Sequence, residues 1–273
     1  EGPSRGFRDR CNFDNLYAYI RWELGLHTVS VSPFAERHSA WWFNAGFMET
    51  HNPGQGGNES AEEVTPIVLD WIDRNGFKDN WFLHVNYWDP HTPYRAPASF
   101  GNPFKNDPLP KWLTKQTLEK HRNMVGPHGA REISMYDNKT NPKYPRHLGE
   151  IKNMRDLHDM IDGYDCGIRY MDSHIGMIVE ALRRKGVYDD LMIIVSSDHG
   201  ENLGEFGIYG EHGTADHGTC NIPMIVKWPG GKSGAVDHGL RQHVAQIDLA
   251  LGAQVQGVGW RKTRRPRALC SSG

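Results

Sequence analysis

The sequence lacks three features that mark whole classes of protein. Its 273 residues include four cysteines that lie far apart without a Cys-x-x-Cys pair, which excludes a zinc-ribbon pattern and a disulfide-dense scaffold. No stretch approaches the ~18–20 uninterrupted apolar residues of a membrane-spanning helix, and the mean hydropathy is −0.64. Neither charge sign is in excess, since 31 Lys and Arg face 33 Asp and Glu. We therefore expect no membrane partner and no nucleic-acid partner.

The composition that remains is typical of a domain with a packed core. Apolar side chains make up 38% of the chain and 30 residues are glycine, as in soluble globular domains. Histidine (15) and tryptophan (9) are unusually frequent. The first residue is Glu1 rather than methionine, so we interpret the chain as a fragment and leave its compartment open.

Short apolar segments alternate with helical patterns in the first part of the chain. Residues 27–32 and 81–88 are β-branched or apolar runs that end near prolines, and both are predicted to be strands. Between them, Ser60 and Glu63 have the spacing of a capping box, followed by apolar residues at helical steps. This part therefore predicts a strand–helix–strand unit.

The second part continues the alternation. Apolar residues recur at steps of three and four from Leu157 to Leu182, which predicts a long core-facing helix. Strands follow at 191–195, expected to be covered on both faces, and at 223–228. Together the segments predict an α/β fold with a mixed, mostly parallel sheet flanked by helices. Its ligand crevice should lie beyond the carboxyl ends of the strands.

Two segments depart from this pattern. Residues from about 89 to 150 are rich in Pro, Asn, Lys and His without a clear period, which indicates a long insertion and a candidate substrate loop. Residues 251–273 are strongly basic and aperiodic, and we interpret them as a disordered or non-native tail. We therefore expect one partial α/β domain over residues 1–250.

Polar residues that suit chemistry follow the predicted strands. Asp198 and His199 come directly after the strand at 191–195, and an oxygen ligand beside an imidazole is a plausible half of a divalent-metal site. The alternative is a turn whose aspartate caps the next helix. His91 lies between two prolines in Trp-Asp-Pro-His-Thr-Pro (88–93), which suits an anion contact or a proton-transfer role. For His91 the alternative is an exposed turn.

Further cationic side chains lie near other strand ends. Arg37 and His38 follow the first strand, where they either meet an anionic substrate or form a solvated loop. Residues 211–217 (Glu-His-Gly-Thr-Ala-Asp-His) supply two more imidazoles. A zinc site that combines these two with His199 is conceivable, although no recognised zinc spacing is present.

In combination, three of these motifs resemble the type I sulfatases of the alkaline phosphatase superfamily. They are Ser-Asp-His-Gly-Glu (197–201) after a strand, Gly-x-His ahead of the Pro-Met-Ile-Val strand (223–226), and Trp-Asp-Pro-His-Thr-Pro (88–93). The likeness is nearly continuous over 164–229 and covers roughly residues 25–250. It implies the sulfatase-like α/β fold of that superfamily, incomplete in this chain.

The resemblance also implies an activity. Members hydrolyse sulfate esters, commonly of sulfated carbohydrates, with a formylglycine made from Cys or Ser inside Cys/Ser-x-Pro-x-Arg, beside a Ca²⁺ ion. Cations and a metal suit an anionic ester, because they neutralise its oxygens and activate the nucleophile. We expect a sulfated small-molecule or glycan substrate and Ca²⁺ as the cofactor, with Zn²⁺ or Mn²⁺ as the alternative.

Residue roles follow from matching positions. Asp198 and His199 match the late pair of metal ligands. His91 matches the histidine that contacts the sulfate or the leaving-group oxygen. His38 matches the histidine of a Lys-x-His pattern. His212 stands eleven residues before a proline, where the family has a lysine, and so replaces that lysine as an anion contact.

We accordingly assign His38, His91 and His212 as catalytic and substrate-binding residues, and Arg37 as a further substrate-binding residue. Glu36 stands at the lysine of the Lys-x-His pattern, which reverses the charge at that position. The first five residues end like the nucleophile motif but carry Glu1 in place of the modified residue. We therefore expect the nucleophile to lie upstream of this chain, and the chain alone to be inactive or nearly so.

One further departure from the family pattern and two alternative functions complete the sequence analysis. Residues 246–250 resemble a late family segment that the following residues do not continue, which suggests an altered carboxyl terminus. A metal-dependent phosphodiesterase or phosphonate hydrolase is the first alternative, with Asp216 and His217 available for a second metal. A non-catalytic glycan-binding remnant is the second, using Trp88 and the pair at 41–42 as stacking platforms.

Overall fold

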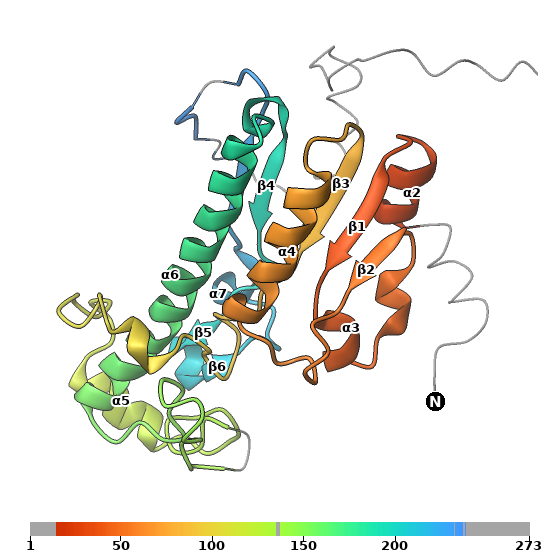
Figure 1. Cartoon of the computed structure of the whole chain (residues 1–273). Coiled ribbons are helices and arrows are strands. Elements are labelled where there is room, and N and C mark those ends of the chain that lie inside the picture. The colour runs from red at the N-terminus through yellow and green to blue at the C-terminus, as the bar shows by residue number, and fades with distance from the viewer. Residues whose placement is uncertain (1–14, 135–136, 232, 237, 239–273) are drawn as a thin grey trace, which may run out of the picture.

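The computed structural model describes residues 15–134, 137–231, 233–236 and 238 (Figure 1). The segments at 1–5 and 246–250 and the basic tail at 251–273 lie outside the described residues. The interpretations of those segments therefore stay predictions.

A parallel sheet forms one half of the architecture. Strand β1 (His27–Val31) lies between β2 (Glu49–His51) and β3 (Trp81–Val85), and both pairings are parallel. A separate antiparallel pair joins β4 (Ile193–Ser196) to β7 (Met224–Lys227). The prediction of a mixed α/β fold with a parallel sheet and helices is confirmed.

Two long helices cover this sheet. Helix α4 (Ala61–Asn75) begins with the predicted capping box, in which the Glu63 carboxylate accepts a hydrogen bond from the Ser60 backbone N–H at 2.8 Å. Helix α6 (Met154–Arg184) packs against α4, and Figure 1 shows it running beside β4. Among the described residues, no helix is both long and apolar enough to cross a membrane.

The core between these helices and the strands is aliphatic and aromatic. Its buried members share contacts with half-buried residues of β3 and β4, so β4 extends the same core although it is not hydrogen-bonded to β3. The buried members are Val29, Val31, Val64, Val68, Trp71, Ile72, Ala181 and Leu182.

The remaining elements are short. They are α2 (Leu16–Trp22), α3 (Phe34–Arg37), α5 (Lys115–Arg122), α7 (His217–Cys220), the hairpin strands β5 (Asn202–Leu203) and β6 (Tyr209–Glu211), and the 3₁₀ turns η1 (Trp41–Asn44), η2 (Ala98–Phe100), η3 (Tyr188–Asp190) and η4 (Glu205–Gly207).

Two strand predictions differ from the structure. The strand predicted at 81–88 ends at Val85, because Asp89 turns inward and accepts a hydrogen bond from the Ala61 N–H at 3.0 Å, at the start of α4. Strand β4 is half-buried along Ile193–Val195 rather than covered on both faces. In the described part of the chain its hydrogen-bonded neighbour is β7 alone, so its predicted full coverage is wrong.

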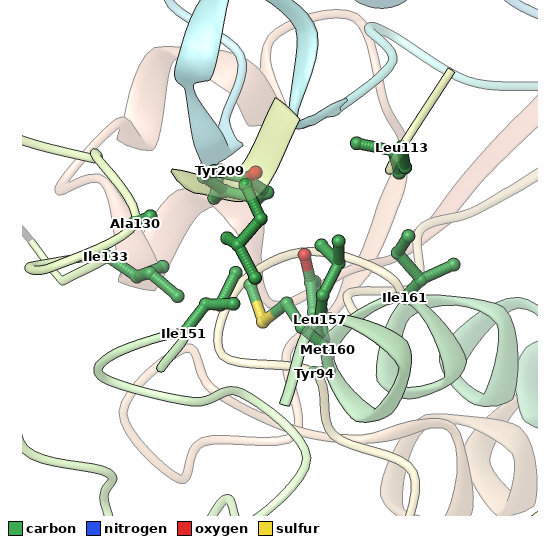
Figure 2. Close-up of a cluster of buried hydrophobic side chains, with 10 residues drawn as sticks. Tyr94, Leu113, Ala130, Ile133, Ile151, Leu157, Met160, Ile161 and Tyr209 are labelled. Carbon is green, nitrogen blue, oxygen red and sulfur yellow. The ribbon is translucent and has the colours of Figure 1, made fainter. Parts of the chain in front are cut away.

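The segment at 89–150 builds a core of its own. Figure 2 shows its apolar side chains converging on the first turns of α6 and on Tyr209 of β6. The backbone joins them too, since the Tyr209 N–H donates to the carbonyl of His128 at 2.8 Å. The insertion is therefore a packed layer against the β5–β6 hairpin. The buried members are Tyr94, Leu113, Leu118, Ala130, Ile133, Ile151, Leu157, Met160, Ile161 and Tyr209.

Gly167 of α6 allows the helix to approach the backbone that follows β3. A Cβ at Gly167 would lie 2.7 Å from the Asp89 carbonyl oxygen, whereas a Cβ at Gly176 of the same helix would meet nothing within 4 Å. We expect Gly167→Ala to lower the unfolding free energy by about 1–3 kcal/mol through overpacking. Gly176→Ala should raise it by about 0.5–1 kcal/mol. Urea unfolding of both variants checks this, and equal effects would contradict the close approach.

We expect the buried His147 to make stability depend on pH. It is buried, its ring lies 5.1 Å from that of Tyr94, and burial lowers its pKa to about 4. The unfolded chain takes up this proton below about pH 6.5 and the folded chain only near pH 4, so stability is lost as the pH falls between these values. Between pH 7 and pH 4, the unfolding free energy of His147→Phe should fall by about 1–3 kcal/mol less than that of the parent chain. Urea unfolding at the two pH values measures this. Parallel pH profiles would rule this out.

Candidate active site

The candidate residues gather at one edge of the fold. Figure 1 shows β1, β3 and β4 running in the same direction, with their carboxyl ends facing α3, α7 and the β5–β6 hairpin. In an α/β fold this is the edge where ligands bind, because the loops that leave the strands converge there.

Three imidazoles from three separate loops meet at this edge. The rings of His199 and His212 are stacked, with centroids 3.9 Å apart and planes 12° apart. The ring of His91 lies edge-on to both, 5.7 Å from His199 and 5.0 Å from His212. One ligand nitrogen from each ring lies within 4.8 Å of the others. The structure thus brings together three of the residues predicted from sequence.

The backbone around His91 is held from inside the protein. Its Nδ1 lies 2.7 Å from the Thr92 carbonyl oxygen, and the buried guanidinium of Arg95 donates to the carbonyls of Trp88 and His91, each at 2.9 Å. Burial lowers the pKa of His91 to about 4, and His212, Arg95 and His199 add to the effect. His91 is therefore a half-buried, held imidazole and not a side chain on an exposed turn.

Asp198 and His199 offer a carboxylate and an imidazole to one point. The Asp198 side chain is 71% exposed, and its Oδ1 lies 3.8 Å from His199 Nε2. Two ligands at this separation can share one ion with bonds of about 2.4 Å, so the pair fits part of a divalent-metal site. Helix α7 is capped by Asp216, which excludes a capping role for Asp198 there. Among the described residues, no three-membered group of ligand atoms includes Asp198.

His212 stands in front of a buried carboxylate. The Glu201 side chain is 2% exposed, and its Oε2 lies 3.8 Å from His212 Nδ1. Glu201 raises the pKa of His212, while burial raises the pKa of Glu201. Sequence reasoning gave Glu201 no role, although it follows the Asp-His-Gly motif directly. The sequence feature that could have identified Glu201 is an acidic residue three positions after Asp198, a candidate metal ligand.

Arg37 and His38 both lie next to the indole ring of Trp88. The His38 ring lies 5.5 Å from that of Trp88, and His38 has its pKa lowered by burial and by the charge of Arg37, against an opposing effect from Asp198. The Arg37 guanidinium lies 5.6 Å from the Trp88 ring, and its Nη1 donates to Asn58 Oδ1 at 2.7 Å. His38 thus lies near the site, while Arg37 is engaged in its framework.

Glu36 points away from these groups into the loop at 52–56. Its carboxylate accepts from the Asn52 amide at 2.8 Å and from the Gly56 N–H at 3.1 Å. The negative charge of Glu36 is therefore neutralised by hydrogen bonds within this loop.

Two alternative sites fit less well. Trp88 is 4% exposed and offers no free face for stacking on a sugar, whereas Trp41 is 59% exposed. His217 is exposed at the start of α7, and the grouped imidazoles include His91 in its place. Its position close to His212 in the sequence suggested His217 as the third imidazole of a metal site. In the structure, His91 is the third imidazole.

Comparisons with known proteins give the chain its relatives. The model of the Sulfatase family matches residues 5–253. The choline-sulfatase of Rhizobium meliloti (strain 1021) is 25% identical over 239 residues, which are 84% of this chain and 43% of that protein. The multifunctional alkaline phosphatase superfamily protein PehA of Trinickia caryophylli is 28% identical over 174 residues, 62% of this chain and 30% of PehA. The chain spans less than half the length of these two relatives.

Solved structures share the fold. The phosphonate monoester hydrolase SpPMH from Silicibacter pomeroyi superposes with a TM-score of 0.52 at 19% identity, over 79% of this chain and 53% of that one. BT4656, solved in complex with its substrate D-glucosamine-2-N,6-O-disulfate, superposes with a TM-score of 0.51 at 14% identity, over 78% of this chain and 55% of that one. The fold is that of the alkaline phosphatase-like hydrolases, and the family match over residues 5–253 shows that this chain belongs to the sulfatase family.

Proposed function

We propose that the site serves the hydrolysis of sulfate esters. The observation that carries this proposal is the convergence of His91, His199 and His212 beside Asp198 at the carboxyl edge of the strands. A sulfate ester carries negative charge on its oxygens, and the site offers imidazoles and a carboxylate–imidazole pair suited to a divalent ion. The whole protein's activity is part of the proposal, because the chain covers less than half of its curated relatives.

His212 and His91 have different roles in this proposal. The Glu201 carboxylate favours the protonated form of His212, which gives the sulfate a cation where the family has a lysine. His91 is neutral in the free protein and presents Nε2, because Nδ1 is bound to the Thr92 carbonyl. An anion next to His91 favours its protonation, and the protonated ring can give its proton to the leaving oxygen.

Asp198 and His199 would hold the divalent ion, which we propose to be Ca²⁺, with Zn²⁺ or Mn²⁺ as alternatives. When bound, the ion supplies charge neutralisation for the sulfate oxygens. One carboxylate and one imidazole are a minority of the six to eight ligands that Ca²⁺ takes. The other ligands and the formylglycine nucleophile belong to the upstream part in this proposal. In this proposal Arg37 holds the loop that contains Asn58. His38 is a further contact for the sulfate.

The proposed substrate is a small sulfate ester, in the first place a sulfated carbohydrate. The relatives support this class, since one is a choline-sulfatase and the solved neighbour BT4656 holds a disulfated glucosamine. The insertion at 89–150, packed beside the β5–β6 hairpin, is where the rest of such a substrate would be selected.

A phosphonate or phosphodiester hydrolase is the second candidate. Its support is the shared fold with SpPMH and the sequence likeness to PehA. A second metal ion would need Asp216, but this carboxylate caps α7 by accepting from the Gly218 N–H at 2.7 Å. The arrangement therefore favours the sulfatase proposal.

Replacing Asp198 tests the proposed function. We expect Asp198→Asn to weaken Ca²⁺ binding by more than about tenfold, because the carboxylate is the charged ligand of the pair. Calorimetry checks this on the 273-residue chain and on a form extended upstream to carry a Cys/Ser-x-Pro-x-Arg segment. Asp172→Asn, an exposed carboxylate of α6, is the matched control. On the extended form, aryl-sulfate turnover should fall together with calcium binding. Uptake of two zinc ions with phosphodiester cleavage would favour the second candidate instead.

Replacing His212 tests the anion contact. We expect His212→Lys to bind inorganic sulfate within a few-fold of the parent chain, because it restores a cation at the same place. His212→Gln, which cannot carry charge, should bind sulfate about tenfold more weakly, a loss of about 1.4 kcal/mol. Competition by sulfate in the aryl-sulfate assay of the extended form measures both. Equal affinities for the Lys and Gln variants would remove His212 from the anion site.

A further inference from the structure

The three imidazoles also have the arrangement of a transition-metal site. His91, His199 and His212 come from loops more than 100 residues apart at their extremes, yet one ring nitrogen of each lies within 4.8 Å of the others. Zn–N bonds of about 2.1 Å require nitrogens within about 3.5 Å of one another, so the rings need to close by about 1 Å. The stacked rings of His199 and His212 must also tilt, so that the lone pairs in their planes point to one ion.

The partners of these rings leave the correct nitrogen free. His91 Nδ1 lies 2.7 Å from the Thr92 carbonyl oxygen, and His199 Nδ1 lies 2.8 Å from the Gly200 carbonyl oxygen. These contacts place the proton on Nδ1 and the lone pair on Nε2, the state in which histidine binds a metal. In both rings Nε2 is therefore the nitrogen that is available to an ion.

The third ring has a carboxylate behind it. His212 Nδ1 is buried and faces Glu201 Oε2 at 3.8 Å. A carboxylate behind a ligating histidine is a recurrent feature of zinc sites, where it orients the ring and increases its basicity. The negative charge of Glu201 also offsets the charge that an ion would bring to this half-buried place.

We propose that His91, His199 and His212 form a site for Zn²⁺ or a similar imidazole-preferring ion, distinct from the oxygen-rich calcium site of the proposed function. Three neutral imidazoles suit Zn²⁺, Ni²⁺ and Cu²⁺, whereas Ca²⁺ selects oxygen ligands such as Asp198. The two sites share His199, so one ion excludes the other from this ring. Zinc bound here also takes the nitrogens of His91 and His212, two of the three proposed anion contacts, so these two rings can no longer donate to sulfate.

The molecule contains a natural control. His158, Asp159 and Asp162 of α6 form the second group of ligand atoms found among the described residues. Its members already have partners, since Asp159 pairs with Arg155 at 2.9 Å and Asp162 accepts from the Asn102 amide at 2.6 Å. We expect replacement of a member of this second group to leave zinc binding unchanged.

The test is a Zn²⁺ titration of the 273-residue chain by calorimetry, with Co²⁺ absorption as a second readout of imidazole ligation. We expect one zinc per chain. His91→Gln and His212→Gln, which keep the side-chain volume, should each weaken it by more than about tenfold. Glu201→Gln should weaken it by about 10–100-fold. Asp198→Asn, His158→Gln and His217→Gln should stay within about twofold, and circular dichroism confirms the fold of each variant.

Three results would overturn the proposal. They are zinc affinity unchanged in both His91→Gln and His212→Gln, zinc affinity lost in Asp198→Asn, and zinc affinity lost in His158→Gln. The proposal shares a ring with the proposed function but fails separately from it. Calcium binding that ignores Asp198 would reject the calcium site alone, and zinc binding that ignores His91 and His212 would reject the zinc site alone.

Discussion

The rest of the site depends on a buried guanidinium. Arg95 is 6% exposed, and burial lowers its pKa to about 10, so a charge lies under the loop that carries His91. The cost of removing this charge from water is offset by hydrogen bonds that the guanidinium donates to carbonyl oxygens of the same loop. Asp89 adds a second anchor by capping α4, and Gly167 lets α6 approach the loop from the other side. One loop is thereby fixed against two helices, and the ring of His91 on it packs edge-on against Trp88.

Electrostatic balance at the site follows from what lies behind each ring. His91 has a cationic neighbour and little water, so its pKa is lowered, whereas His212 has a buried carboxylate behind it and its pKa is raised. Two identical side chains 5.0 Å apart therefore have pKa values shifted in opposite directions. Such a difference is what acid–base chemistry on an anion requires, and it comes from the position of Glu201 and not from the histidines themselves.

Local signals predicted the elements well, because they act within a few residues. The capping box at Ser60 and the apolar steps of the long helix were confirmed, as was the sheet class. The end of β3 and the half-exposed face of β4 were missed, because both depend on contacts with distant segments. The core of the insertion was missed for the same reason, since its apolar residues are isolated in sequence and meet only in the fold, against α6 and Tyr209. At the site, a motif pointed to His91, but its contact with His199 and His212 is a property of the fold.

The proposed replacement of a family lysine by His212 joins these arguments. A lysine at this place would be a permanent cation with no affinity for a metal ion in its charged form. Histidine in front of Glu201 is a cation when an anion is present and a ligand when it is neutral. Position 212 also completes the set of three rings, because His91 and His199 alone are two ligands. In the two proposals the same residue therefore contributes both to the contact with sulfate oxygens and to the choice of metal ion, and the buried carboxylate behind it supports both states.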